Sequence, residues 1–570
     1  MTGAPGSRPV TGAPGAPAGP PVPPAPGGPL ALGHGTAAAV DRRALRAGRL
    51  GLAATAASIG GTIAVAAAGP SVMEPGLPGT AGQPPWSAGL GLPEYLAVAL
   101  AAAALAAGTA GLGLCLYAAR RGWAVRPWVL LAAGIIAATA LALLPPFGSS
   151  DHLSYAAYGR MVATGHDPYT TTPAMLARLG DPVARAVQDW RHSPSVYGSL
   201  ATGGQALASV IGGQSVRLTV FALSVLNLVT FAGAGLLLHL LTRGRRDRQL
   251  RAALLWTCNP LLLQVLVAGG HVDSQAVAFT VAAIALFCLG VQNAGAAASP
   301  VRRSGAAAAA GVAVGLAFAV KLSMVLVATG LLVAAALLWW PRDGMAGRGP
   351  AARYWLAASG LAAGFAATAA AAFAPWGLRS LSPALRAGSF VSIGSPWRAV
   401  RAALSFPVGE QTADDLVKAG AIVLAIALAG LFARPLIDLA RRPLTDLMER
   451  REPDPAVVAA ASVLAVGFAW LAAWPYVLPW YDGLAWAPLA LLPWLPFPWA
   501  VLDWLVLART AALAFGYLPA RGIVMPAGLD WLRSVVRMGV TPVMLLAVTV
   551  TLAVVLWRAR ERQPRAAGSP

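Results

Sequence analysis

Long apolar runs recur along this chain, and most of them are close to the length of a membrane-spanning helix. The hydrocarbon core of a bilayer requires roughly 20 apolar residues in a helix, and by that measure the sequence contains about fourteen candidate spans. Hydrophobic residues make up 57% of the 570 residues and charged residues only 11%, which excludes a water-facing surface. We therefore predict an all-α polytopic membrane protein. Its candidate spans are 50–68, 94–117, 128–144, 216–241, 252–268, 274–290, 305–320, 322–340, 355–374, 416–433, 456–470, 483–497, 499–517 and 541–557.

Basic residues fall in short clusters between the apolar runs, for example at Arg243 and Arg441. Such clusters mark cytoplasmic loops and set the orientation of the spans. The formal net charge of +20 therefore reflects membrane topology, and we expect no nucleic-acid partner. Loops on the opposite side, 69–93, 269–273 and 474–482, contain no Lys or Arg. We predict a protein of the cell membrane with both termini in the cytoplasm.

The predicted organisation is one membrane domain, residues 50–557, between two cytoplasmic tails. Residues 1–49 are rich in Pro, Ala and Gly and cannot bury enough apolar surface to offset the entropy of ordering, so we predict a disordered tail. The first long apolar stretch lies far from the N-terminus and is interpreted as a retained signal anchor. Residues 558–570 form the second tail. Loops 145–215 and 375–415 face outside, where we predict short interfacial helices over a cavity.

A polar segment follows the third candidate span and begins at Asp151 and His152. Tyr155 and Tyr158 are three residues apart and Arg160 lies on the next turn, as in a helix. A turn follows at Asp167-Pro168-Tyr169. Asp151 is predicted to be a reactive carboxylate where the chain leaves the hydrocarbon core. The alternative is that Asp151 only caps the helix.

Three more polar segments fall on the same predicted face of the membrane. The first, 189–198, contains Arg191 and Tyr197, and its alternative role is interface anchoring. The second is the Gly-Gly-His-x-Asp turn with His271 and Asp273, which packing alone does not explain. The third is Lys321, alone among apolar residues, which could also extend its amine toward the interface. Convergence on one face indicates a functional site.

Such a site suits a reaction whose donor is a lipid-linked phosphosugar. Asp151 could take the proton of the acceptor hydroxyl, and no partner acid is needed because the phosphate leaves already ionised. We predict that Arg160, Arg191 and Lys321 bind the donor phosphate. No metal or nucleotide motif occurs, so we predict no cofactor and leave open a loosely bound divalent cation. The residues predicted to bind substrate are His152, Tyr155, Tyr158, Asp167, Tyr169, Tyr197, His271, Asp273, Trp480 and Tyr481.

The ordered polar motifs resemble those of the actinobacterial polyprenyl-phosphomannose-dependent alpha-(1→6)-mannopyranosyltransferases, members of the GT-C superfamily. Each motif alone is weak, but they occur in the family's order over most of the membrane domain. The motifs are Asp151/Ser154/Tyr155/Gly159, Gly165/Asp167/Pro168/Tyr169, Trp190/Arg191/Ser193/Pro194/Tyr197/Gly198, Asn259/Pro260, Gly269/Gly270/His271/Asp273, Lys321 and Trp474/Pro475/Trp480/Tyr481.

The resemblance implies a GT-C-type glycosyltransferase fold and an inverting enzyme with Asp151 as its general base. It also implies a polyprenyl-phosphate-mannose donor and a mannan or glycolipid acceptor of the cell wall, such as lipomannan. Val272 and Ser199 depart from the family pattern close to the expected pocket. The same fold could therefore use another donor sugar, arabinose or glucose. A secondary transporter or lipid flippase is the alternative of a different class.

Overall fold

Helices form the secondary structure of the computed structural model, and no strand occurs among the residues that it describes, 41–292, 300–339, 348–441, 454–519 and 525–561. The described residues belong to one compact unit. The all-α prediction is confirmed. Most of the predicted N-terminal tail and residues 562–570 of the C-terminal tail lie outside the described residues, although residues 42–49 belong to the first helix.

Ten helical segments of the described chain are long and apolar enough to cross a membrane. Seven of them are the single helices α1 (Arg42–Ala68), α2 (Glu94–Arg120), α8 (Val216–Leu241), α11 (Asp273–Gln292), α14 (Arg348–Phe373), α17 (Glu410–Arg441) and α18 (Pro455–Ala473). An eighth is α20 (Trp499–Gly516). The other two are composite: α9 (Arg246–Ala252) with η1, α10 and η2, and η6 (Ala527–Leu529) with η7 (Leu532–Val540) and α21 (Thr541–Glu561).

Three shorter apolar helices correspond to further predicted spans. They are α3 (Pro127–Ala142), α12 (Pro300–Val320) and α13 (Val325–Trp339), which follows the short 3-10 helix η3 (Leu322–Met324). Lys321 separates α12 from η3 in an extended conformation, with φ −149° and ψ 123°. The sequence around Lys321 therefore forms two helices and not one kinked helix.

The predicted span 483–497 is not a full-length helix. It contains the 3-10 helix η5 (Pro479–Asp482) running into α19 (Gly483–Leu491), which has only nine residues. A nine-residue helix is about 14 Å long, less than half of the hydrocarbon thickness. Pro493, Pro496 and Pro498 prevent continuation, because proline lacks the N–H that the helix needs. The expected count of fourteen full spans is therefore not confirmed.

The segment from Arg246 to Ala268 is broken in its middle, and every residue from Leu250 to Ala268 is buried. Pro260 cannot donate a backbone hydrogen bond, and the Asn259 side chain instead accepts bonds from the N–H groups of Leu261 (3.1 Å) and Leu262 (3.3 Å). The break separates two π-helical stretches, η1 (Ala253–Thr257) and η2 (Leu263–Ala268), with α10 (Pro260–Leu262) between them. The segment ends at the Gly269-Gly270 turn, which leads to His271 and Asp273.

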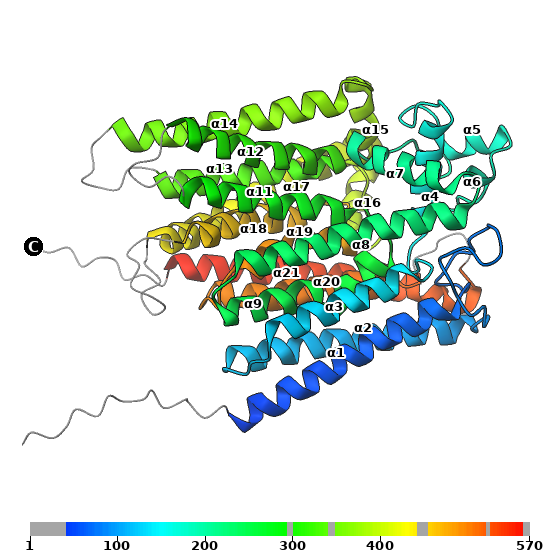
Figure 1. The fold of residues 1–570 in the computed structure, drawn as a ribbon, viewed down its shortest axis with the longest axis horizontal. Coiled ribbons are helices and arrows are strands. Elements are labelled where there is room, and N and C mark those ends of the chain that lie inside the picture. The colour runs from blue at the N-terminus through cyan, green and yellow to red at the C-terminus, as the bar shows by residue number, and fades with distance from the viewer. Residues whose placement is uncertain (1–40, 293–299, 340–347, 442–453, 520–524, 562–570) are drawn as a thin grey trace, which may run out of the picture. The chain divides into compact units, whose positions relative to one another are not determined.

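Short helices gather at one end of the helical bundle, which we call the α4 end (Figure 1). They connect α3 to α8, and α14 to α17, in the two regions predicted as long external loops. The first group is α4 (Asp151–Ala163), α5 (Pro173–Arg178), α6 (Pro182–Arg185) and α7 (Ser199–Gly212). The second is η4 (Leu378–Leu381), α15 (Ser382–Ala387) and α16 (Trp397–Val408).

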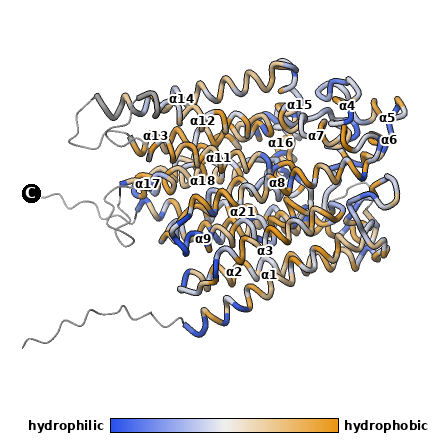
Figure 2. The backbone as a smooth tube through the Cα atoms, viewed as in Figure 1, coloured by the Kyte–Doolittle hydropathy of each residue, from blue (hydrophilic) through white to orange (hydrophobic). Residues whose placement is uncertain are grey.

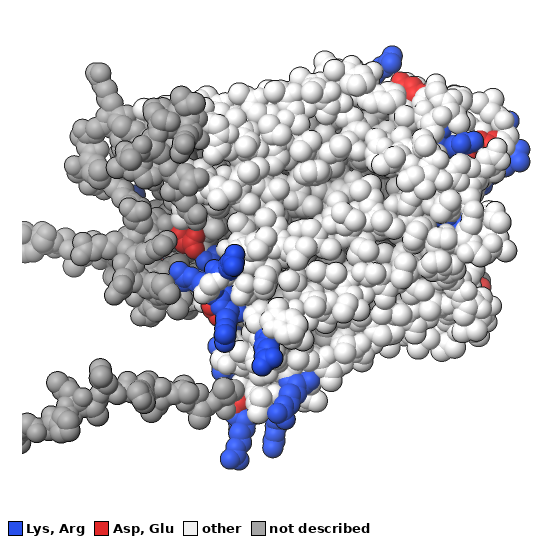
Figure 3. All heavy atoms as spheres, viewed as in Figure 1, with Lys and Arg blue, Asp and Glu red and all other residues white. Residues whose placement is uncertain are grey.

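Hydrophobic residues run along the middle of the helices, and hydrophilic residues concentrate toward the two ends (Figure 2). On the face shown in Figure 3, Lys and Arg gather at the end that holds α9 and the start of α1, and a broad uncharged band separates them from the α4 end. This pattern is that of a multi-pass membrane protein.

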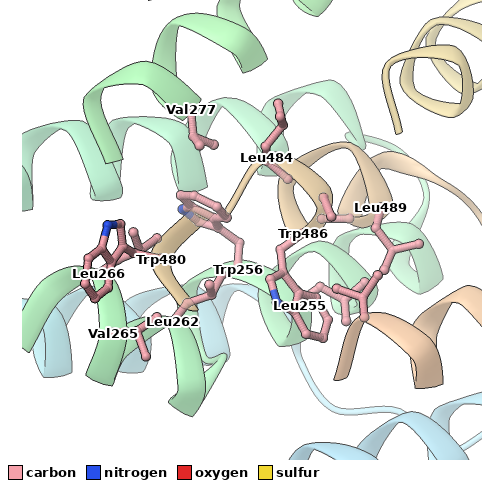
Figure 4. Close-up of a cluster of buried hydrophobic side chains, with 14 of the residues drawn as sticks. Leu255, Trp256, Leu262, Val265, Leu266, Val277, Trp480, Leu484, Trp486 and Leu489 are labelled. Atoms are coloured by element: carbon pink, nitrogen blue, oxygen red, sulfur yellow. The ribbon is translucent and has the colours of Figure 1, made fainter. Parts of the chain in front are cut away.

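A buried apolar cluster packs the broken segment 246–268 against α19 (Figure 4). Trp256 and Leu266 contribute from the broken segment, Val277 from α11, and Trp480 and Trp486 from η5 and α19. Trp480 is only 2% exposed, although it also reaches the cavity described below. The cluster therefore packs against the side of Trp480 that faces away from the cavity, and so supports this wall of the cavity.

A buried ion pair between Arg509 of α20 and Asp482 of η5 anchors the same wall. Both side chains are almost fully buried, at 2% and 1% exposure. Arg509 also donates to the carbonyl of Leu471 (2.8 Å), and Asp482 accepts from the Thr510 hydroxyl (2.7 Å). Asp482 directly follows Trp480 and Tyr481. The Arg509–Asp482 ion pair therefore holds residues 474–482, which we call the aromatic loop, against α18 and α20.

We predict that Asp482→Asn lowers the free energy of unfolding by about 3–5 kcal/mol, because Arg509 is left buried without its carboxylate. Thermal unfolding in detergent measures the change. The matched control is Asp414→Asn, whose partner Arg401 and the carboxylate itself are 32% and 25% exposed. That pair should contribute about 1 kcal/mol or less. Equal losses in the two variants would contradict the assignment of Asp482–Arg509 as the more strongly stabilising ion pair.

Candidate functional site

Asp151 is held at the α4 end by the chain that connects α3 to α4. The N–H of Phe147 bonds to the carbonyl of Ala268 (2.9 Å), and the N–H of Gly148 bonds to the carbonyl of Met73 (2.7 Å). These contacts fix the connection between the end of η2 and the loop after α1. Asp151 is then the first residue of α4, and its side chain is 12% exposed.

The alternative that Asp151 only caps this helix is wrong. Ser150 occupies the N-cap position, and no side-chain capping bond forms there. The Ser150 hydroxyl donates instead to the carboxylate of Asp189, while the N–H of Asp151 donates to the Ser149 hydroxyl (3.1 Å). The Asp151 carboxylate therefore has no helix-capping role and lines a cavity.

Burial raises the pKa of Asp151 to about 7, from an ordinary value of 3.8. The nearby carboxylates of Asp189 and Asp273 act in the same direction, because like charges disfavour ionisation. A hydrogen bond from Trp190 and the charge of Lys321 act in the opposite direction. A carboxyl group of this kind can gain and lose a proton near neutral pH.

His271 lies close to the Asp151 carboxylate. Its Nδ1 lies 3.7 Å from a carboxylate oxygen of Asp151, longer than a hydrogen bond. Burial holds the pKa of His271 well below its usual value, so its ring is neutral. The ring stacks on Trp480 with 3.5 Å between centroids, and Nδ1 lies 3.4 Å from the Tyr155 hydroxyl. Gly270, with φ +66°, makes the turn that brings His271 to this position.

Lys321 and Asp273 form an ion pair, with 2.6 Å between Nζ and the carboxylate oxygen. Their side chains are 14% and 3% exposed. The ammonium group also lies over the ring of Tyr481, 3.3 Å from its centroid, as in a cation–π contact. Lys321 thus joins the junction of α12 and α13 to the start of α11 and to the aromatic loop. It does not extend toward the interface as an isolated charge.

A cavity of about 400 Å³ lies in front of these groups. Most of its lining surface is apolar, and its polar groups come from α4, the segment before α7, residues 321–323, α15 and residues 476–481. Aromatic rings form much of the wall. The lining includes Asp151, Ser154, Tyr155, Tyr158, Trp190, His192, Tyr197, Lys321, Arg386, Phe390, Trp470, Trp474, Tyr476, Trp480 and Tyr481.

The structure brings together many of the residues predicted from sequence. Asp151, Tyr155, Tyr158, Tyr197, Lys321, Trp480 and Tyr481 line the cavity. His271 and Asp273 lie directly behind it and contact its lining residues. His152 is buried in α4 and does not line the cavity. The Tyr197 hydroxyl donates to that of Tyr155 (3.2 Å), which links the two polar segments of the first long loop.

Four predicted residues lie elsewhere. Arg160 pairs with Asp181 (2.7 Å) on the far side of α4, and Arg191 is exposed outside the cavity. Asp167 accepts a bond from the N–H of Tyr169 (2.9 Å) and so shapes a turn, as its position before a proline favours. The Tyr169 hydroxyl bonds to Thr202 (3.1 Å). Asp167 also pairs with Arg379 (3.6 Å), and Tyr169 contacts Trp376 edge to face, so these two residues join the two long loops.

Most of the other lining residues, Trp190, Tyr476 and Arg386 among them, were not among the predicted site residues. Trp190 lay within a recognised polar segment, but its role looked like interface anchoring. Tyr476 lies next to the Trp474-Pro475 motif, and that adjacency was a usable signal. Arg386 had no local signal, because only the fold brings α15 over the cavity. Within the described residues, no three His, Cys, Asp or Glu side chains gather as a metal site.

A family model matches the part of the chain that contains most of the polar motifs. Residues 48–338, just over half of the chain, match the family described as Alpha-(1->6)-mannopyranosyltransferase, N-terminal domain. The chain belongs to this family. The resemblance drawn from the polar motifs is thereby confirmed, and the matched range contains Asp151, His271 and Lys321.

Individual relatives match over shorter stretches. Alpha-(1->6)-mannopyranosyltransferase B of Corynebacterium glutamicum is 32% identical over 145 residues, which cover 25% of this chain and 24% of that protein. A probable alpha-(1->6)-mannopyranosyltransferase of Mycolicibacterium smegmatis is 35% identical over 136 residues, 23% of this chain and 24% of that protein. The matches thus span about a quarter of the length of these relatives.

Among solved structures, the chain is similar to the archaeal oligosaccharyltransferase AglB from Archaeoglobus fulgidus, solved with an inhibitory peptide and a dolichol-phosphate. The TM-score is 0.36 at 16% identity, and the match covers 77% of this chain and 58% of that one.

The Lys321–Asp273 pair generates a prediction about stability. Lys321→Met and Asp273→Asn should each lower the free energy of unfolding by about 3–5 kcal/mol, because each leaves a buried charge without its partner. The double variant should lose less than the sum of the two losses, since no charge is then left unpaired. Thermal unfolding of the four proteins in detergent measures this coupling. Additive losses would show that the two groups do not interact.

Proposed function

We propose that this protein transfers a mannosyl residue from a polyprenyl-phosphate-mannose donor to a mannan or glycolipid acceptor. The reaction would be an inverting single displacement, with Asp151 as general base. The observation that carries the proposal is the place of the Asp151 carboxyl group: it lines a cavity, and burial raises its pKa to about 7. Family membership supports mannosyl transfer as the reaction.

In this reaction the acceptor hydroxyl attacks C1 of the mannosyl group while its proton passes to Asp151. The bond between C1 and the phosphate oxygen breaks, and the polyprenyl phosphate leaves with the electron pair. Its phosphate is already ionised, so the leaving group needs no general acid. The resting carboxylate returns when Asp151 releases the proton to solvent. The reaction as written requires neither a redox partner nor a nucleotide.

The charges around the cavity support binding of a lipid phosphate. Of the three cations predicted for this role, Lys321 alone lines the cavity. Arg386 of α15 lines it too, is exposed, and donates to the Ser382 hydroxyl (2.5 Å). We therefore assign donor-phosphate binding to Lys321 and Arg386. Arg160 does not line the cavity and is therefore not assigned this role. The apolar wall at Trp470 and Trp474 of α18 and its following loop suits the lipid chain.

The proposal places the cavity at the outer face of the cell membrane, with both termini in the cytoplasm. Its support is the distribution of charge. The basic clusters of the sequence concentrate at the end opposite α4, where positively charged loops face the cytoplasm. The cavity lies at the α4 end, among the loops and short helices that connect the spans.

The direct test of the base is Asp151→Asn. The amide keeps the size of the side chain but cannot accept the proton, so kcat for mannosyl transfer should fall by roughly 100- to 10,000-fold. Transfer is measured in membranes supplied with polyprenyl-phosphate mannose. Asp414→Asn, outside the cavity, is the control for expression and insertion. Transfer by Asp151→Asn at a rate close to wild type would remove Asp151 from the base role.

The raised pKa of Asp151 predicts the pH dependence of the wild-type reaction. Below about pH 7 the carboxyl group carries a proton and cannot take another, so kcat/KM should fall as the pH decreases. Above it the rate should reach a plateau. The profile is measured between pH 5 and pH 9 at about constant ionic strength, because electrostatic effects depend on salt. A flat profile across neutral pH would contradict Asp151 as the ionising group.

A further inference from the structure

The helix α16 turns its paired charge toward the protein and its apolar side chains away from it. Half-buried residues recur three or four positions apart, at Trp397, Arg401 and Leu404, and so form the face that packs against α17. The opposite face is exposed, and none of the twelve residues of α16 is fully buried. The exposed face consists of Ala399, Val400, Ala402, Ala403, Phe406 and Pro407.

The polar groups on the inner face of α16 find their partners within the protein. Arg401 donates to both carboxylate oxygens of Asp414 (2.5 and 3.2 Å) and lies 3.8 Å from Glu410. The Ser405 hydroxyl, on the same face, donates to the carbonyl of Arg401 (2.8 Å). A helix between a protein core and water has the reverse arrangement, with apolar residues inside and charges outside. The outer face of α16 is therefore not suited to water.

The start of α16 is tied to the aromatic loop. The N–H of Ser392 bonds to the carbonyl of Pro475 (3.0 Å), and the Ser392 hydroxyl donates to the carbonyl of Val477 (3.0 Å). The indole of Trp397 donates to the carbonyl of Ala473 (2.7 Å), the last residue of α18. These contacts hold α16 beside the candidate spans α17 and α18, so its outer face has a fixed direction.

α16 runs antiparallel to the first part of α17. Trp397, its first residue, packs against Gly420, where an added Cβ would lie 3.1 Å from the tryptophan ring, and Arg401 pairs with Asp414. Gly420 belongs to the predicted span 416–433, so the start of α16 lies beside the apolar part of α17 and its end lies nearer to Glu410. A helix of twelve residues is about 18 Å long and too short to cross the hydrocarbon core.

We propose that the outer face of α16 binds membrane lipids of the leaflet at the α4 end. Phe406, which is 97% exposed on the protein, and the apolar residues beside it contact the acyl chains near the headgroups, as the apolar faces of interfacial helices do. Arg398 is exposed at the border of this face, where its long side chain can reach a lipid phosphate. An exposed apolar surface of this kind marks a membrane or protein contact, and the cation at its border favours lipid.

Spin labelling of the full chain in lipid nanodiscs tests the proposal. Ala399→Cys, Ala403→Cys and Phe406→Cys each receive a nitroxide, and the native cysteines Cys115, Cys258 and Cys288 are buried. Oxygen concentrates in lipid and a nickel chelate stays in water, so the ratio of the nitroxide's collision rates with the two reports its surroundings. The ratio should be severalfold higher than for Arg178→Cys, an exposed position at the end of α5, and should increase from position 406 to position 399.

Two results would overturn the proposal. Ratios equal to that of Arg178→Cys would place the outer face of α16 in water. Low collision rates with both reagents would show that protein, such as a second copy of this chain, covers the face. A thermal unfolding midpoint equal to that of the wild type shows that a labelled variant is folded, and Ala399→Cys, a small change, carries the test if Phe406→Cys is unstable. The measurement uses no sugar donor, so its outcome is independent of the proposed function.

Discussion

The ion pair between Lys321 and Asp273 is the contact on which the rest of the site depends. It joins the junction of α12 and α13 to the start of α11, and Tyr481 covers its cationic partner. Isolated charges at this depth would be costly, and pairing makes both tolerable in an apolar bundle. The pair also supplies charges of both signs beside Asp151, so the field at the proposed base follows from how the helices meet.

Other buried ion pairs also join helices and loops elsewhere in the bundle. Arg509 and Asp482 anchor the aromatic loop, and Arg251 pairs with Asp503 at the opposite end. Where lipid offers no hydrogen bonds, such contacts must be completed within the protein. The aromatic wall of the cavity is therefore fixed by ionic contacts behind it. We expect a cavity of stable shape, in which the carboxylate of Asp151 is directed by its neighbours.

The sequence predicted the parts of this arrangement that depend on local pattern. Apolar runs located the helices, and Asp151, His271 and Lys321 stood out because ionisable groups next to apolar spans are costly and are usually functional. Segment 483–497 was counted as a span for its apolar composition, although its stretch is broken by prolines and α19 has only nine residues. The pairing of Arg160 with Asp181 and the contacts of Trp190 and Arg386 were not predictable. They arise between segments that only the fold brings together, and no residue spacing encodes them.

The most direct test of the central claim is a membrane assay that offers polyprenyl-phosphate mannose, arabinose and glucose in parallel, each radiolabelled. Membranes containing the wild-type protein should transfer label from the mannose donor to an endogenous glycan or glycolipid, and membranes without the protein should not. Transfer from the arabinose or glucose donor alone would agree with the proposed reaction at the cavity but contradict mannose as the donor sugar. Use of no donor at all would contradict the account and favour a transport function for the fold.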